Sequence, residues 1–192
     1  MTGIVIELIY SAVTGHRLLR LKDTLANLSL YAGYTILVTL WIGVVYAAYA
    51  WVHEYRLFNF GPWWMDISSW QFFACWGTLW LLEDFTFYWF HRVSHRSRFF
   101  WASHITHHSS KEFNYSVAMR QTWLPFSAFV FWLWLPLIGF DPLMVMSMQV
   151  INLAFQGLLH TRMIGSLGAL EWVFNTPQHH SVHHGSNAAY ID

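Results

Sequence analysis

Charged residues are scarce in this sequence, and their scarcity argues against a water-soluble protein. Asp, Glu, Lys and Arg make up 10% of the 192 residues, whereas hydrophobic residues make up 56%. An ordinary soluble domain has about 25% charged residues. The composition therefore predicts an integral membrane protein, with one membrane-embedded domain over residues 1–192. The formal net charge is zero, so nothing in the composition favours nucleic acid as a partner.

Cysteine is almost absent, which excludes a disulfide within the chain. Cys75 is the single cysteine, and it lies in an apolar run. Cysteine usage therefore says nothing about the redox compartment. A short basic segment followed by a cleavable apolar core is also missing at the start of the sequence. We expect the first long apolar segment to act as an uncleaved signal anchor.

Four apolar segments are predicted to cross the membrane as helices, and they leave polar segments between them. The predicted spans are residues 29–52, 70–90, 123–140 and 143–160. Residues 1–28 are expected to form an amphipathic segment at the membrane interface. We interpret residues 53–69, 91–121 and 161–192 as polar connections.

The distribution of Lys and Arg predicts the orientation of these spans. Basic residues are concentrated on one side of the predicted topology: Arg17, Arg20, Lys22, Arg92, Arg96, Arg98, Lys111, Arg120 and Arg162. Because basic loops stay in the cytoplasm, both termini are expected to be cytoplasmic. The predicted fold class is an all-α, multi-pass integral membrane protein. About four transmembrane helices would carry a cytoplasmic helical cap.

Nine of the twelve histidines have the spacing of metal ligands, and all nine fall on the predicted cytoplasmic side. They form three clusters and one isolated residue: His91 and His95; His104, His107 and His108; His180, His183 and His184; and His160. Steps of three and four residues place each cluster on one face of a helix. The cytoplasmic cap is therefore predicted to hold a histidine-rich site.

Two metal ions explain these histidines better than an ordinary polar surface does. Crowded imidazoles without a metal would partly protonate near pH 6.5 and repel one another. Nine ligands are too many for one zinc ion, which usually takes four. Spacing alone does not separate iron from zinc, and zinc can occupy such a site in a purified sample. Zinc has no redox chemistry, and the sequence has no His-Glu-x-x-His motif. We therefore expect two iron ions and O2.

The three histidine motifs, in this order between apolar segments, resemble those of the fatty acid hydroxylase/sterol desaturase superfamily. Residues 101–121 and 175–187 are most similar to the alkylglycerol monooxygenases and their bacterial relatives. The resemblance implies a membrane di-iron enzyme that oxidises a lipid C–H bond, with the eight motif histidines and His160 as ligands. It also implies an external reductant: tetrahydrobiopterin, cytochrome b5 or a ferredoxin-like donor. Members of the superfamily normally continue past Asp192, so we expect a C-terminal portion to be absent.

Five further polar residues are candidates for roles around the metals. Asp84 and Tyr88 precede His91 on nearly the same helical stripe, and we take both as candidate catalytic groups. An acid inside a span is costly and tends to be functional. The alternative for Asp84 is a hydrogen bond between helices. Asn114, Arg120 and Asn175 flank the clusters, where they could order loops or bind a polar headgroup or reductant.

The predicted function is hydroxylation of a lipid C–H bond with O2 and two external electrons. A desaturase is an alternative on the same site, because hydroxylation and desaturation begin with the same hydrogen abstraction. A non-catalytic membrane metal or haem protein is the alternative from another class. Haem needs only one or two axial histidines, which fits clusters of three less well.

Overall fold

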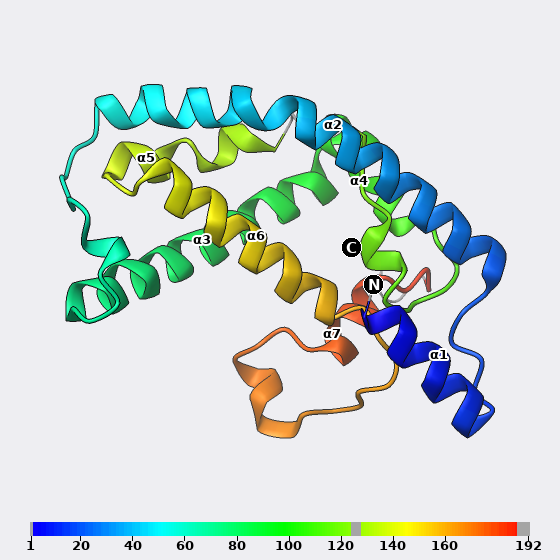
Figure 1. Ribbon diagram of the computed structural model, residues 1–192. Coiled ribbons are helices and arrows are strands. Elements are labelled where there is room, and N and C mark those ends of the chain that lie inside the picture. The colour runs from blue at the N-terminus through cyan, green and yellow to red at the C-terminus, as the bar shows by residue number, and fades with distance from the viewer. Residues whose placement is uncertain (1, 124–127, 188–192) are drawn as a thin grey trace. The chain divides into compact units, whose positions relative to one another are not determined.

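The computed structural model describes residues 2–123 and 128–187, and these residues are helical with no strand (Figure 1). The α-helices are α1 (Thr2–Thr14), α2 (Leu21–Glu54), α3 (Trp70–Arg96), α4 (Arg98–His108), α5 (Trp134–Ile138), α6 (Pro142–Leu158) and α7 (Pro177–His183). Short 3-10 turns lie between several of them. The all-α part of the predicted fold class is confirmed.

Within the described residues, the chain forms two compact units. One contains residues 2–34, 104–123 and 154–187, and we call it the histidine unit. The other contains residues 35–103 and 128–153, and we call it the apolar unit. The long helix α2 contributes its first turns to the histidine unit and the rest to the apolar unit.

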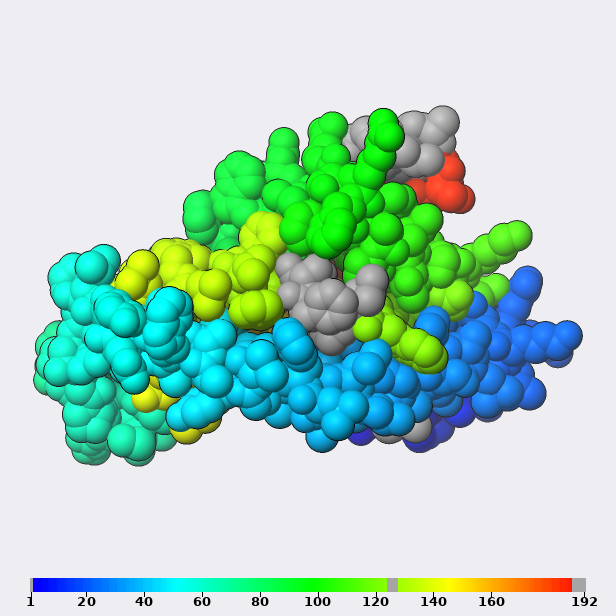
Figure 2. All heavy atoms as spheres, turned by 90° about the horizontal axis from the view of Figure 1, so that it is seen from above, coloured from blue at the N-terminus to red at the C-terminus, as the bar shows by residue number. Residues whose placement is uncertain are grey.

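Helix α2 is the one helix in the described part of the chain that is long and apolar enough to cross a membrane. Its 34 residues extend about 50 Å at 1.5 Å per residue, against a hydrocarbon core of about 30 Å. Its second half presents large apolar side chains outward, and Leu40 is 75% exposed. Figure 2 shows this half of α2 uncovered on the face turned to the viewer. A bare apolar surface of this kind is typical of a helix surrounded by lipid.

The predicted four continuous spans are not confirmed. Helix α3 begins at Trp70 as predicted and continues to Arg96, and helix α6 has only 17 residues. The expectation of a continuous helix over residues 123–140 is wrong. Residues 124–127 lie outside the described part, and the following residues form a 3-10 turn, Phe129–Trp132, and the five-residue helix α5. Pro136 lies in α5, and a proline cannot donate the backbone hydrogen bond that a longer preceding helix would need.

The core of the apolar unit contains one carboxylate, which joins α3 to α6. The core side chains are Tyr49, Cys75, Leu79, Trp132, Leu135, Phe140, Met144, Val145 and Met148. Glu83 is 1% exposed and accepts hydrogen bonds from Trp132 Nε1 at 3.3 Å and Asn152 Nδ2 at 2.5 Å. A buried polar group without partners would cost about 1–3 kcal/mol. These two donors therefore allow an acid to lie between packed helices.

A second buried carboxylate fixes α1 within the histidine unit. Glu7 accepts a hydrogen bond from the backbone N–H of Tyr115 at 2.9 Å and from Thr161 Oγ1 at 2.9 Å. Burial raises the pKa of the Glu7 carboxyl, and the two hydrogen bonds oppose that rise. Thr161 directly follows His160. Glu7 therefore ties the N-terminal helix to a segment that carries one of the predicted ligands.

Candidate metal centre

Four imidazoles converge in the histidine unit: His107 of α4, His160 after α6, His180 of α7 and His184 at its C-cap. One ring nitrogen of each lies within 4.8 Å of the others. His160 Nε2 is 3.1 Å from His107 Nε2 and 3.0 Å from His180 Nε2. His160 and His180 are buried, and the other two are half-buried. We call these four residues the four-histidine set.

Local structure explains why these side chains meet. Thr176 is the N-cap of helix α7: its hydroxyl accepts a hydrogen bond from His179 N, and Pro177 occupies the first helical position. This start defines the register, so that His180 and His184 lie one turn apart on one face. His160 Nδ1 lies 2.8 Å from Gln156 O, which leaves Nε2 directed at the other rings. A backbone contact of this type orients a ligating imidazole.

The four-histidine set fits a metal ion better than it fits a hydrogen-bonded cluster. Two Nε2 atoms can share only one proton, and His184 Nε2 is buried without a hydrogen-bond partner in the described structure. Burial removes water from His107 and His184, and neighbouring histidines would repel a positive charge there. Both effects hold the pKa values of these two imidazoles well below the usual value. Neutral imidazole is the form that binds metals. Ligands about 2.1 Å from a tetrahedral metal are about 3.4 Å apart, close to the distances found here.

The remaining motif histidines form two further groups, one in each unit. In the histidine unit, ligand atoms of His104, His108 and His183 lie within 4.8 Å of one another. Helix geometry brings His104 Nε2 to 3.1 Å from His108 Nε2. In the apolar unit, His91 Nε2 lies 3.1 Å from His95 Nε2 in the last turns of α3. These two groups are partly exposed, unlike the buried centre of the four-histidine set.

The two candidate catalytic residues lie on the outer face of α3. Asp84 is exposed, and Tyr88 is exposed and accepts a hydrogen bond from Arg92 Nη1 at 2.8 Å. The buried acid of this helix is Glu83, to which the sequence analysis gave no role. A signal was present, because Glu83 follows Cys75 and Leu79 at intervals of four residues, on the stripe that enters the core.

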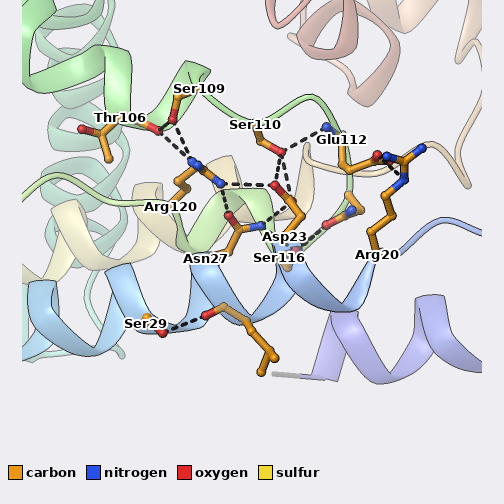
Figure 3. Close-up of polar contacts among 12 residues, drawn as sticks. Arg20, Asp23, Asn27, Ser29, Thr106, Ser109, Ser110, Glu112, Ser116 and Arg120 are labelled. Carbon is orange, nitrogen blue, oxygen red and sulfur yellow. Dashed lines mark hydrogen bonds and ion pairs between the residues drawn. The ribbon is translucent and has the colours of Figure 1, made fainter.

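Arg120 lies in a polar network that joins the start of α2 to the last turn of α4 (Figure 3). Its Nη1 donates to Asn27 Oδ1 at 2.6 Å and to Asp23 Oδ1 at 3.3 Å. Its Nε donates to Thr106 O at 3.0 Å and to Ser109 Oγ at 2.9 Å. The last carbonyls of a helix have no partner within the helix, and a cation there is favourable. Arg120 therefore holds the turn that carries His107 and His108.

Asn114 extends the same network, whereas Asn175 lies apart from it. Asn114 is fully buried, donates to Leu18 O at 2.9 Å and accepts from Ser116 Oγ at 2.6 Å. Ser116 in turn accepts from Asn27 Nδ2 at 2.8 Å. Asn175 is exposed and precedes Thr176, the N-cap of α7. A role for Asn114, Arg120 or Asn175 in binding substrate or reductant stays a prediction.

Comparison with known proteins identifies the family of this chain and several relatives. Residues 76–191 match the family model of fatty acid hydroxylase. Alkylglycerol monooxygenase of Xenopus tropicalis is 37% identical over 98% of this chain and 41% of its own length. The Homo sapiens protein of that name is 39% identical over 90% of this chain and 37% of its own length. The chain thus spans about two fifths of these relatives. No solved structure matches it.

Arg120→Ala is expected to weaken metal binding at the four-histidine set by about 10-fold or more, as loss of contacts behind a ligand typically does. Arg120→Lys should recover part of the affinity, because lysine keeps the charge but cannot reach all four acceptors. Metal content after dialysis against graded chelator measures the effect.

Lys111→Ala is the matched control for Arg120→Ala. It removes one positive charge from an exposed position of the same connection and should leave metal retention unchanged. Equal retention in Arg120→Ala and Lys111→Ala would show that the network does not hold the ligands in place.

Proposed function

We propose, on the premise that this chain belongs to the fatty acid hydroxylase family, that it hydroxylates a lipid C–H bond with O2 at a membrane surface. The observation that carries the proposal is the convergence of His107, His160, His180 and His184. Nitrogen ligands without a carboxylate suit a redox metal. The names of the relatives add support for a lipid substrate.

The proposed centre contains two iron ions. The four-histidine set would hold one, and His104, His108 and His183 would hold the other together with His91 and His95 of the first motif. His91 and His95 are assigned to the second iron because they form the first histidine motif of the sequence. Bound there, the iron pair would activate O2 for attack on a lipid C–H bond. Zinc would bind to the same nitrogens in iron-poor samples.

The protein's own residues would provide ligation, order and exclusion of water. Burial around His160 and His180 keeps bulk water from that part of the centre. In the overall reaction R–H, O2, two electrons and two protons yield R–OH and water. An external reductant must supply the electrons, and tetrahydropterin, cytochrome b5 and ferredoxin-like donors are the candidates.

The topology and the polar residues complete the proposal. About four membrane-crossing segments would leave both termini and the histidines on the cytoplasmic side. Asp84 and Tyr88 lie on α3 before His91, and we propose that they take part in the reaction as polar groups near the metal centre. Asn114, Arg120 and Asn175 would border the site for the lipid headgroup or the reductant, with Arg120 and Asn114 also ordering the connection that contains them.

The experiment that tests the function compares three lipid classes under 18O2. Alkylglycerol, sterol and free fatty acid are each supplied to the full-length protein with tetrahydropterin or a ferredoxin-type donor. With alkylglycerol and tetrahydropterin we expect one 18O atom at the carbon beside the ether oxygen. The hemiacetal formed there breaks down to a fatty aldehyde and glycerol, and prompt reduction of the aldehyde to the alcohol preserves the label for mass spectrometry. Loss of two hydrogens without 18O incorporation would identify a desaturase. No turnover, with haem absorption in the visible spectrum, would favour the non-catalytic alternative.

His180→Ala is expected to abolish turnover and to reduce bound metal, because it removes a ligand from the four-histidine set. His179→Ala changes the adjacent, exposed residue of the same helix and should preserve both properties. Elemental analysis and the 18O2 assay on membrane-extracted protein measure the outcome. The two variants should be present in the membrane at equal levels, since insertion depends on the apolar segments. Full activity of His180→Ala would remove this residue from the ligand set.

Asp84→Asn is expected to reduce kcat several-fold while metal content changes little. The change keeps the shape of the side chain, removes its charge and replaces one acceptor oxygen with an NH2 donor. Glu54→Gln, at the exposed end of α2, is the control for loss of an acid elsewhere. Unchanged turnover in Asp84→Asn would leave Asp84 without a part in the reaction.

A further inference from the structure

An exposed apolar loop precedes the helix that carries three histidines. The connection 163–174 lies between α6 and α7 in the histidine unit, within the segment 161–192 that was predicted to be polar. Most of its side chains are nevertheless apolar and turned outward: Ile164, Leu167, Leu170, Trp172, Val173 and Phe174. Trp172 is 89% exposed and Val173 is 78% exposed. We call these six residues the apolar loop.

The conformation of the loop is held by its single charged residue. Glu171 Oε1 accepts from the backbone N–H of Leu167 at 3.1 Å and from Thr176 Oγ1 at 3.2 Å, and Oε2 accepts from Ser166 Oγ at 3.1 Å. The hydrogen bond from Leu167 N, supported by the two hydroxyls, lowers the pKa of the Glu171 carboxyl. The carboxylate therefore serves the loop itself, and its apolar residues are left as the outward surface.

A bare surface of this composition requires a partner. Contiguous exposed apolar side chains mark an interaction site or a membrane contact. Tryptophan is enriched at the level of lipid headgroups, because its ring is apolar and its N–H is polar. No basic or acidic side chain of residues 163–174 other than Glu171 is available to recognise a charged protein surface.

The histidine unit has a second surface that suits a bilayer, and it indicates which partner the loop meets. Helix α1 buries Glu7 and leaves Val5, Ile9 and Val13 exposed on one stripe at steps of four residues. Exposed Arg17 and Lys22 follow it, and basic residues beside an apolar stripe favour an anionic lipid surface. From there the chain enters α2, the helix able to cross a membrane.

We propose that the apolar loop inserts into the headgroup region of the lipid bilayer and holds α7 against the membrane surface. Thr176 connects the two elements, because its hydroxyl donates to Glu171 and also caps α7. A lipid leaving the bilayer at the loop would arrive beside the helix that carries His180, His183 and His184. This delivery role rests on the proposed function, whereas the contact with the bilayer does not.

Spin labelling of the full chain in lipid nanodiscs tests the bilayer contact. A nitroxide is attached at Trp172→Cys in a Cys75→Ala background, and its collisions with O2 and with a water-soluble nickel chelate are measured. Oxygen concentrates in lipid, so we expect the label at position 172 to be accessible to O2 and poorly accessible to nickel. Val173→Cys provides a second label if the first variant does not fold. Lys111→Cys, in a charged connection of the same unit, should show the opposite pattern.

Two results would overturn the contact. Nickel accessibility at positions 172 and 173 equal to that at position 111 would place the loop in water. Protection from both reagents would mean that protein covers the loop, either another part of the chain or a second copy.

Kinetics test the delivery role separately. Trp172→Ser combined with Val173→Ser should raise KM for a bilayer-embedded lipid several-fold, with kcat and metal content unchanged. If KM were unchanged while the spin labels showed lipid-like accessibility, the loop would still contact the bilayer but would have no role in delivering the lipid. A protein with lipid-like accessibility that oxidises no lipid would refute the proposed function alone.

Discussion

The histidine unit depends on keeping neutral imidazoles in contact. Rings whose Nε2 atoms lie 3.0–3.1 Å apart cannot all carry protons, and each protonation would add a positive charge beside its neighbours. Without a metal ion, such an arrangement persists only if the surrounding structure prevents the rings from separating. The contacts around His107, His160 and His180 provide that support at three different points of the chain.

Two of these supports are polar contacts that join segments distant in sequence, and the third is the local N-cap of α7. Arg120 binds the last turn of α4 and, through Asp23 and Asn27, the beginning of α2. Glu7 binds Thr161, the residue after His160. Thr176 starts the helix that carries His180. Buried or half-buried polar groups are costly unless paired, so these contacts favour one arrangement of the ligand-bearing segments over others.

The amino-acid sequence predicts the structure correctly where local pattern decides it. It predicted helical segments, the start of α3 at Trp70 and clusters at steps of three and four residues, since each depends on neighbours along the chain. It was wrong about a continuous helix over residues 123–140, where Pro136 allows only a short one. It did not find the partners of Arg120, about ninety residues away, because composition carries no information on such pairings. The apolar loop before α7 was not predicted. Arg162 and the histidines that follow led to the interpretation of the whole segment 161–192 as polar, although apolar residues lie between them.

The order of the ligands along the chain has a consequence for biosynthesis. His107 emerges from the ribosome early, His160 later, and His180 and His184 last, so the four-histidine set is incomplete until residue 184 has been made. A partial set of imidazoles binds metal weakly and reversibly, and α2 can enter the membrane long before it is complete. If the set holds a metal as proposed, its capture would follow the synthesis of residue 184. A cell short of metal would accumulate inserted but immature protein rather than protein that fails to reach the membrane.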